Sequence, residues 1–112
     1  MKELTKAEEE IMQVLWDMES GFVKDIIAKF PEPKPAYSTV STIVRILQQK
    51  GFVGHESHGQ SHKYHPVISK DEYASTFMTG FVSKYFSGSY QKMVSFFTKE
   101  ENLSLTELEE LV

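Results

Sequence analysis

Cysteine is absent from the 112-residue chain, which excludes disulfide bonds, thiol nucleophiles and thiolate metal sites. No apolar run approaches the length of a membrane span, and the N-terminus lacks a signal-peptide pattern. We therefore expect a cytoplasmic protein with no membrane partner. The hydroxyl residues lack a neighbouring base with its orienting group, and no carboxylate pair lies in an apolar context. We therefore expect neither catalysis nor a cofactor.

A net positive charge is also lacking. The formal charge is −4, which is the wrong sign for a nucleic-acid binder taken as a whole. The distribution is uneven, because residues 34–66 carry a net charge of +3 and all four histidines, whereas residues 67–112 carry −3. The basic bias thus lies in one segment. Its few cations predict a modest attraction to phosphate in each chain, which a dimer would double.

Residues 36–51 predict a helix with one apolar and one hydrogen-bonding face. The apolar positions recur at helical spacing, at Val40, Ile43, Val44 and Leu47. The opposite face carries Ser38, Thr42, Arg45 and Gln49, with Ser41 beside it. Hydroxyls and one guanidinium differ from the Glu/Lys mixture of an ordinary solvated helix face. Gly51 is expected to end the helix, because glycine tolerates the left-handed conformation found there.

The segments around this helix predict a winged helix-turn-helix. A capping box, Thr5 with Glu8, opens a first helix that ends at Ser20-Gly21, and residues 23–30 form a second. Two strands are expected over residues 52–56 and 62–67, with Gly59 at the tip of the connecting loop. Three helices followed by a β-hairpin indicate binding to duplex DNA. A winged-helix protein-interaction module that never touches DNA is the alternative.

The C-terminal part predicts a helical extension. Ser69 with Glu72 and Ser104 with Glu107 are further capping boxes, and a helix break is expected near residues 87–89. We divide the chain into a DNA-binding domain over 1–67 and a dimerisation region over 68–112. The apolar residues of the extension have no obvious partner layer in their own chain, so a two-fold dimer is preferred to a monomer core. The predicted interface comprises Tyr73, Phe77, Phe81, Tyr85, Phe96, Phe97, Leu105 and Leu108.

The predicted DNA contacts follow from the chemistry of the grooves. Base edges in the major groove accept and donate hydrogen bonds, and the N-terminal residues of a recognition helix reach deepest. The base-contact candidates are therefore Ser38, Thr39, Ser41 and Thr42, while Arg45 is assigned to bases or phosphate. Weaker phosphate candidates are Lys63, Lys34 and Tyr37, together with His58, Gln60 and Ser61 of the hairpin.

Four histidines, His55, His58, His62 and His65, lie within eleven positions and raise a metal-responsive alternative. Strand side chains alternate between faces, so a hairpin scatters these rings unless the register aligns two pairs. We assign no metal site.

Three separated blocks of the sequence resemble the penicillinase/methicillin-resistance repressor family, also called the BlaI/MecI/CopY family. The first comprises residues 4–8 and 11–16, and the third comprises residues 97–104 with Glu107-Leu108. The second is similar to a threonine- and glycine-containing helix pattern, here Thr39, Val40, Thr42, Arg45, Leu47, Lys50 and Gly51. Two departures stand out: many members have a basic residue where this chain has Ser41, and the copper-responsive branch uses cysteines that this chain lacks.

The resemblance implies a dimeric repressor of palindromic operator DNA, regulating a β-lactamase-type or another stress-inducible operon. In the antibiotic-resistance branch a sensor-pathway protease cleaves the repressor in its C-terminal region. The matching position here is Phe96-Phe97, where many members have Asn-Phe. The resemblance leaves two routes to derepression open, which are proteolysis and a bound signal.

Overall fold

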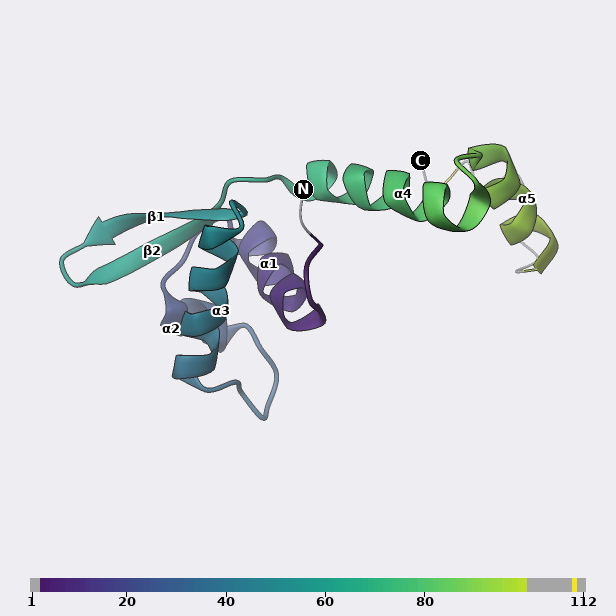
Figure 1. Ribbon diagram of the computed structural model, residues 1–112. Helices are drawn as coiled ribbons and strands as arrows, with labels where there is room; N and C mark the ends of the chain where they lie inside the picture. Colours follow the sequence, from purple (N-terminus) through teal and green to yellow (C-terminus); the bar gives the residue numbers. More distant parts are fainter. Residues whose placement is uncertain (1–2, 101–109, 111–112) are drawn as a thin grey trace. The chain divides into compact units, whose positions relative to one another are not determined.

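The computed structural model describes residues 3–100 and residue 110, and it confirms a mainly helical chain with one antiparallel hairpin (Figure 1). The elements are α1 (Lys6–Met18), α2 (Val23–Ala28), α3 (Tyr37–Gln49), β1 (Val53–His58), β2 (Ser61–Pro66), α4 (Lys70–Phe86) and α5 (Tyr90–Glu100). The chain forms two compact units, residues 1–73 and residues 74–112. The functional division into residues 1–67 and 68–112 stays a prediction.

Local hydrogen bonds place the helix starts where the sequence predicts them. The Thr5 hydroxyl accepts from the Glu8 amide at 3.2 Å, and the Glu8 carboxylate accepts from the Thr5 amide at 2.9 Å. Ser69 and Glu72 make the same reciprocal pair at 3.1 and 3.3 Å. Two of the three predicted capping boxes are therefore confirmed, and the third lies outside the described residues.

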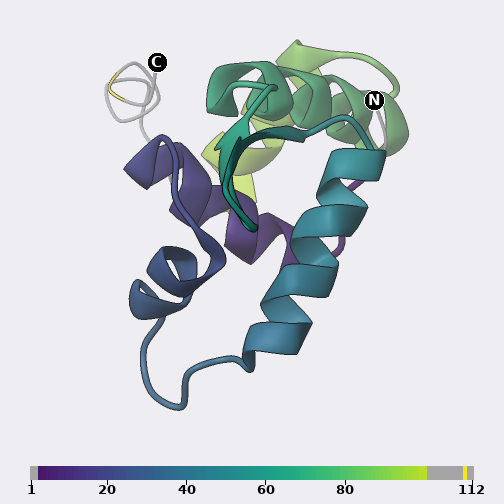
Figure 2. The same ribbon diagram turned by 90° about the vertical axis from the view of Figure 1, so that its left-hand side faces the viewer.

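The core of the first unit is built from one face of each helix. In Figures 1 and 2, α1, α2 and α3 form a small cluster from which the hairpin projects as a wing. The apolar stripe predicted for α3 is buried at Val40, Val44 and Leu47, and Ile43 is partly buried. These side chains pack with Ile11, Met12, Leu15, Ile26 and Phe52. Gly51 has φ +83°, which gives the chain its left-handed exit from α3.

The wing is tighter than the sequence indicates. The strands run from Val53↔Pro66 to His58↔Ser61, so only Gly59 and Gln60 connect them, where a five-residue loop was expected. Gly59 has φ +64° at the first connecting position, where two-residue turns of the II′ type favour glycine. An isolated bridge also joins Gly21 to Tyr64, with N–O distances of 2.9 and 2.8 Å. This bridge ties the wing to the connection between α1 and α2.

The second unit contains most of α4 and all of α5. Ser87 and Gly88 both have positive φ, at 52° and 78°, and they separate the two helices as predicted. Val82 is buried within the described part of the unit, whereas Phe77, Tyr85, Tyr90, Val94 and Phe96 remain exposed. The unit therefore presents an apolar surface, which is described below.

Candidate nucleic-acid interface

The hydrogen-bonding face of α3 is open to solvent. Ser38, Thr39, Thr42 and Arg45 are exposed and Ser41 is partly buried, on the side opposite the buried stripe. No residue of α3 is acidic. A face of hydroxyls and one guanidinium without a carboxylate suits base edges and phosphates, because nothing on it repels a polyanion.

Arg45 lies back along its own helix. Its Nε donates to the Ser41 carbonyl oxygen at 3.3 Å, and its Nη2 donates to the Thr42 Oγ1 at 3.4 Å. These are long bonds at an exposed position, so they cost little to exchange for a bond to a base or phosphate. The structure thus brings Arg45 and Thr42 together on the predicted face.

Lys34 has a local structural role. Its ammonium donates to the carbonyl oxygens of Phe30 at 2.7 Å and Ala28 at 3.3 Å, at the C-terminal end of α2. Cations at this end of a helix satisfy carbonyls that have no intrahelical partner. Lys34 therefore orders the connection that leads into α3, and its predicted phosphate contact would compete with these bonds.

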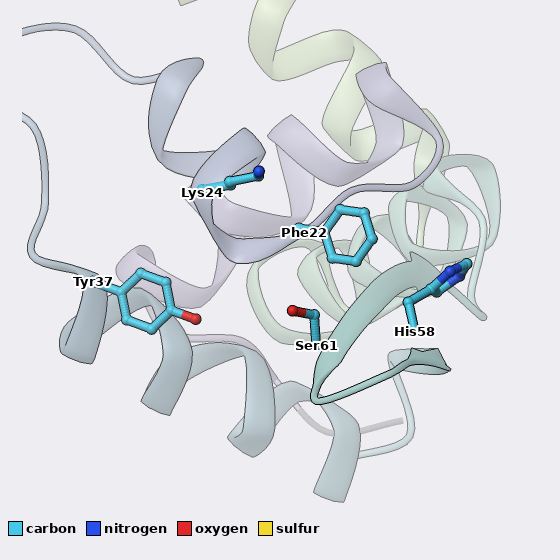
Figure 3. Close-up of a pocket in the computed structure, with 5 residues that line it drawn as sticks. All are labelled: Phe22, Lys24, Tyr37, His58 and Ser61. Atoms are coloured by element: carbon cyan, nitrogen blue, oxygen red, sulfur yellow. The ribbon is translucent and has the colours of Figure 1, made fainter.

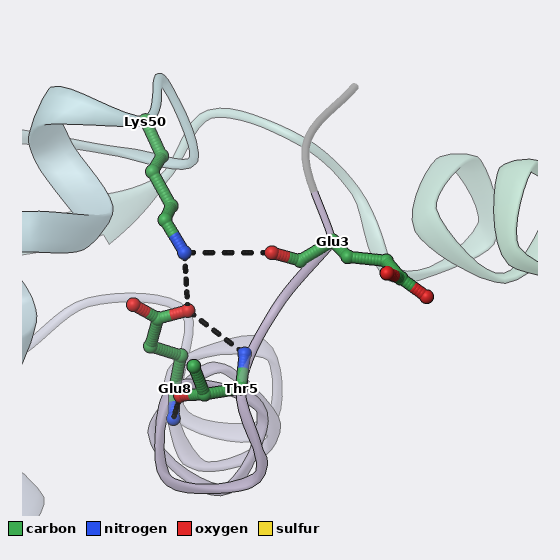
Figure 4. A network of polar contacts seen from close by, with 4 residues as sticks. All are labelled: Glu3, Thr5, Glu8 and Lys50. Carbon is green, nitrogen blue, oxygen red and sulfur yellow. Dashed lines mark hydrogen bonds and ion pairs between the residues drawn. The ribbon is translucent and has the colours of Figure 1, made fainter.

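Lys50 is engaged in an ion pair that the sequence did not reveal (Figure 4). Its ammonium lies 2.6 Å from Glu8 Oε1 and donates to the Glu3 carbonyl oxygen at 3.4 Å. Burial acts to raise the pKa of Glu8, but the bonds from Lys50 and the Thr5 amide outweigh it and hold the pKa below its ordinary value. The pair fastens the C-terminal end of α3 to the start of α1. One of the four cations counted in residues 34–66 is thereby neutralised.

The wing places two of its four histidines on each face. The register puts His55 and His62 on one face and His58 and His65 on the other. The rings of His55 and His62 stack at 4.1 Å with 9° between their planes, and His55 Nδ1 lies 3.1 Å from Gln48 Oε1. Within residues 3–100 and 110, no group of three or more His, Asp or Glu side chains could hold a metal.

The tip of the wing is polar. His58 Nε2 lies 3.6 Å from Glu56 Oε2, while Lys63 is opposite Glu56 in the ladder and is partly buried. An open hollow of about 250 Å³ lies between α2, α3 and this tip, and Figure 3 shows its lining residues. They are Phe22, Lys24, Tyr37, His58 and Ser61. Sequence reasoning did not single out Lys24, because only the fold brings α2 beside the wing.

The predicted dimer residues divide between the two units. Tyr73 belongs to the first unit, where its ring lies 5.8 Å from those of Trp16 and Phe52. In the second unit, Phe77, Tyr85 and Phe96 are exposed, and Phe81 and Phe97 are partly buried. Tyr90 and Val94 of the same unit are also exposed. Leu105 and Leu108 lie outside the described residues.

Comparison with known proteins identifies the family. A family model described as penicillinase repressor matches residues 4–112. The chain belongs to the penicillinase repressor family. The methicillin resistance regulatory protein MecI of Staphylococcus aureus (strain N315) is 26% identical over 110 residues, covering 97% of this chain and 89% of MecI. The penicillinase repressor of Bacillus licheniformis is also 26% identical over 110 residues, covering 97% of this chain and 86% of that repressor.

Solved structures of other regulators align with this fold. The structure of the CopR repressor aligns with a TM-score of 0.50 and 28% identity, covering 61% of this chain and 100% of CopR. The structure of an hsRosR-S4 complex aligns with a TM-score of 0.59 over 99% of this chain and 95% of that one; at 16% identity it supports the fold alone.

Membership of the penicillinase repressor family makes this chain a DNA-binding transcriptional repressor and not an enzyme, as predicted. The resemblance read from the sequence is therefore confirmed. None of the described helices has the length and apolar character needed to cross a bilayer. The individual base, phosphate and dimer contacts stay predictions.

Proposed function

We propose that the protein represses its target as a homodimer, with one α3 from each chain in successive major grooves of a palindromic operator. The observation that carries this proposal is the exposed face of α3, which combines hydroxyls and Arg45 with no carboxylate. His58 and Ser61 of the wing line the same open hollow as Tyr37 at the N-terminal end of this helix, where groove-reading residues are expected. Symmetric half-sites would lie about one helical turn apart, or a multiple of it.

Dimerisation compensates for the low positive charge. Lys34 and Lys50 donate strong bonds within the chain, which leaves two other cations in residues 34–66. Arg45 is exposed and held only by long bonds, and Lys63 is partly buried. Two chains double the number of phosphates that can be neutralised, and the affinity rises steeply with that number. Binding to a single half-site would be too weak to repress.

The aromatic surface of the second unit is the proposed dimer contact. Phe77, Tyr85 and Phe96 are exposed in the single chain, and Phe81 lies between Phe77 and Tyr85, with ring distances of 6.3 and 5.2 Å. Exposed aromatic clusters of this kind mark contact surfaces in proteins that do not span membranes. A two-fold axis would bury the same surface on both chains.

The target is proposed to be a β-lactam-resistance operon or another stress-inducible operon, by analogy with the named regulators of methicillin resistance and penicillinase. Derepression by a sensor-pathway protease would cut between Phe96 and Phe97 in α5. Because a helical peptide bond does not fit a protease cleft, α5 would have to unwind locally before cleavage. A bound ligand is the second route.

Gel shifts on the DNA upstream of the protein's own gene test the proposal. We expect a complex on this DNA that survives an excess of scrambled duplex, and light scattering of the free protein that gives twice the chain mass. Equal affinity for both duplexes would favour the alternative of a protein-interaction module, and a strict monomer would refute the dimer.

A further inference from the structure

The hollow between α2, α3 and the wing has the chemistry of an anion site. Lys24 of α2 supplies an ammonium, Tyr37 of α3 and Ser61 of β2 supply hydroxyls, and none of the described residues that line the space carries a carboxylate. In Figure 3 the hydroxyls of Tyr37 and Ser61 point into the space between α3 and the wing. Phe22 forms an apolar wall. Three elements that are distant in sequence therefore place hydrogen-bond donors around one small opening.

The donors at this site are available to a ligand. Among the described residues, the Lys24 ammonium and the hydroxyls of Tyr37 and Ser61 make no hydrogen bond or ion pair. Tyr37 is 63% exposed, and Lys24 and Ser61 are also exposed. The neighbouring Asp25 carboxylate accepts from the Phe22 amide at 3.0 Å and makes no ion pair with Lys24.

The wall of the hollow is held in place by the wing. The His58 ring packs edge-on against Phe22, with 5.5 Å between centroids, and its Nε2 lies 3.6 Å from the Glu56 carboxylate. We assign His58 to this wall and not to the donor set. The hollow therefore depends on the wing being in place, which links a ligand bound there to the position of the wing.

We propose that Lys24, Tyr37 and Ser61 bind one phosphodiester group of the DNA backbone, at the edge of the groove that α3 enters. The inference rests on the proposed function and deepens it. A phosphate oxygen is an acceptor without a proton to donate, so it matches an ammonium and two hydroxyls. The site lies beside the first turn of α3 and the tip of the wing, so a phosphate there fixes how deep and in which register the helix lies.

The test compares two substitutions that remove the same charge. Lys24→Gln removes the proposed contact, and Lys6→Gln is the control, since Lys6 is exposed at the start of α1, near the opposite end of α3. Binding to a random-sequence duplex is measured by fluorescence anisotropy over a series of salt concentrations. We expect Lys24→Gln to reduce the magnitude of the slope of log K against log salt by about 0.9, the value for one phosphate contact. Lys6→Gln should leave the slope unchanged.

Tyr37→Phe tests the contribution of the Tyr37 hydroxyl independently of the Lys24 charge. It should weaken binding about three- to tenfold at one salt concentration without changing the slope, because it removes a neutral donor. Circular dichroism confirms that each variant is folded.

The outcomes separate the possible failures. If wild-type protein binds duplex DNA and Lys24→Gln keeps the wild-type slope, the phosphate site is wrong and the proposed function stands. If wild-type protein binds neither random nor native upstream duplex at low salt, the proposed function itself fails. Inorganic phosphate is also titrated into the free protein while the NMR chemical shift of the Ser61 backbone amide is followed. If that shift saturates, and Lys24→Gln leaves the salt dependence of DNA binding unaltered, the hollow binds a free anion and the phosphodiester proposal is overturned.

Discussion

Lys50→Met is predicted to destabilise the first unit at neutral pH through the buried partner it leaves behind. The Glu8 side chain is 6% exposed and the Lys50 side chain 21%, so the pair lies between a surface ion pair and a fully buried one. Surface pairs contribute up to about 1 kcal/mol, and removing one partner of a buried pair costs about 3–5 kcal/mol. Because Glu8 keeps its bond from the Thr5 amide, we expect a loss of about 2 kcal/mol.

The pKa of Glu8 determines how the loss of stability should depend on pH. In the wild type the pKa of Glu8 lies below its ordinary value of 4.5, so the pair stabilises the fold above pH 4.5 and loses that contribution as the pH falls through the lowered pKa. In Lys50→Met, burial is no longer opposed by the ammonium and raises the pKa of Glu8. The difference in stability between the two proteins should therefore be full at pH 7 and shrink toward pH 4.

Urea unfolding followed by fluorescence of Trp16, the single tryptophan, measures the first unit. Its indole donates to the Ile68 carbonyl oxygen at 2.9 Å, so its emission reports packing within that unit. Lys29→Met, at an exposed position after α2, is the matched control. The double variant Glu8→Gln with Lys50→Met should recover part of the stability that Lys50→Met loses. A loss below about 0.5 kcal/mol at pH 7, within the range of surface substitutions, or a loss independent of pH, would refute the reasoning.

Four further predictions concern DNA, the dimer and induction. Arg45→Ala should reduce the magnitude of the free energy of operator binding by about 1–3 kcal/mol if the guanidinium contacts a base. If it contacts phosphate, gel shifts should show equal losses of affinity for the native and scrambled duplexes. Thr42→Ala should weaken operator binding while the circular dichroism spectrum is unchanged. Phe81→Ala should shift the dimer toward monomer in sedimentation at nanomolar concentration, since truncating a buried phenylalanine costs about 3–5 kcal/mol, and an unchanged dimer would exclude this surface. Intact mass spectrometry of induced cells should find a fragment ending at Phe96, whereas full-length protein throughout derepression would point to a ligand.

The fold was predictable wherever the determinants are local. The capping residues Thr5 and Ser69 are observed in the predicted roles, and Gly51 follows the end of α3 as expected. These features depend on residues three or four positions apart, which a sequence presents directly. At the tip, β1 ends two residues later and β2 begins one residue earlier than predicted, because Gly59 permits a tighter turn than the surrounding polar residues indicate.

The site was only partly predictable because much of it is made by distant contacts. Lys50 and Glu8 are 42 residues apart, and nothing local marks that lysine as paired and not free for DNA. Lys24 joins Tyr37 and Ser61 only after α2 and the wing have been brought together by the core. The stacking of His55 on His62 likewise depends on the exact register of the hairpin, which the turn determines.

The most direct test of the central claim is the footprint and stoichiometry of the complex on the DNA upstream of the protein's own gene. The account predicts two chains per operator and two protected half-sites related by two-fold symmetry, about one helical turn apart or a multiple of it. It also predicts that the protection disappears in Arg45→Ala at protein concentrations that protect fully with the wild type. A single chain per duplex, or protection that does not distinguish this DNA from a scrambled sequence, would contradict the account.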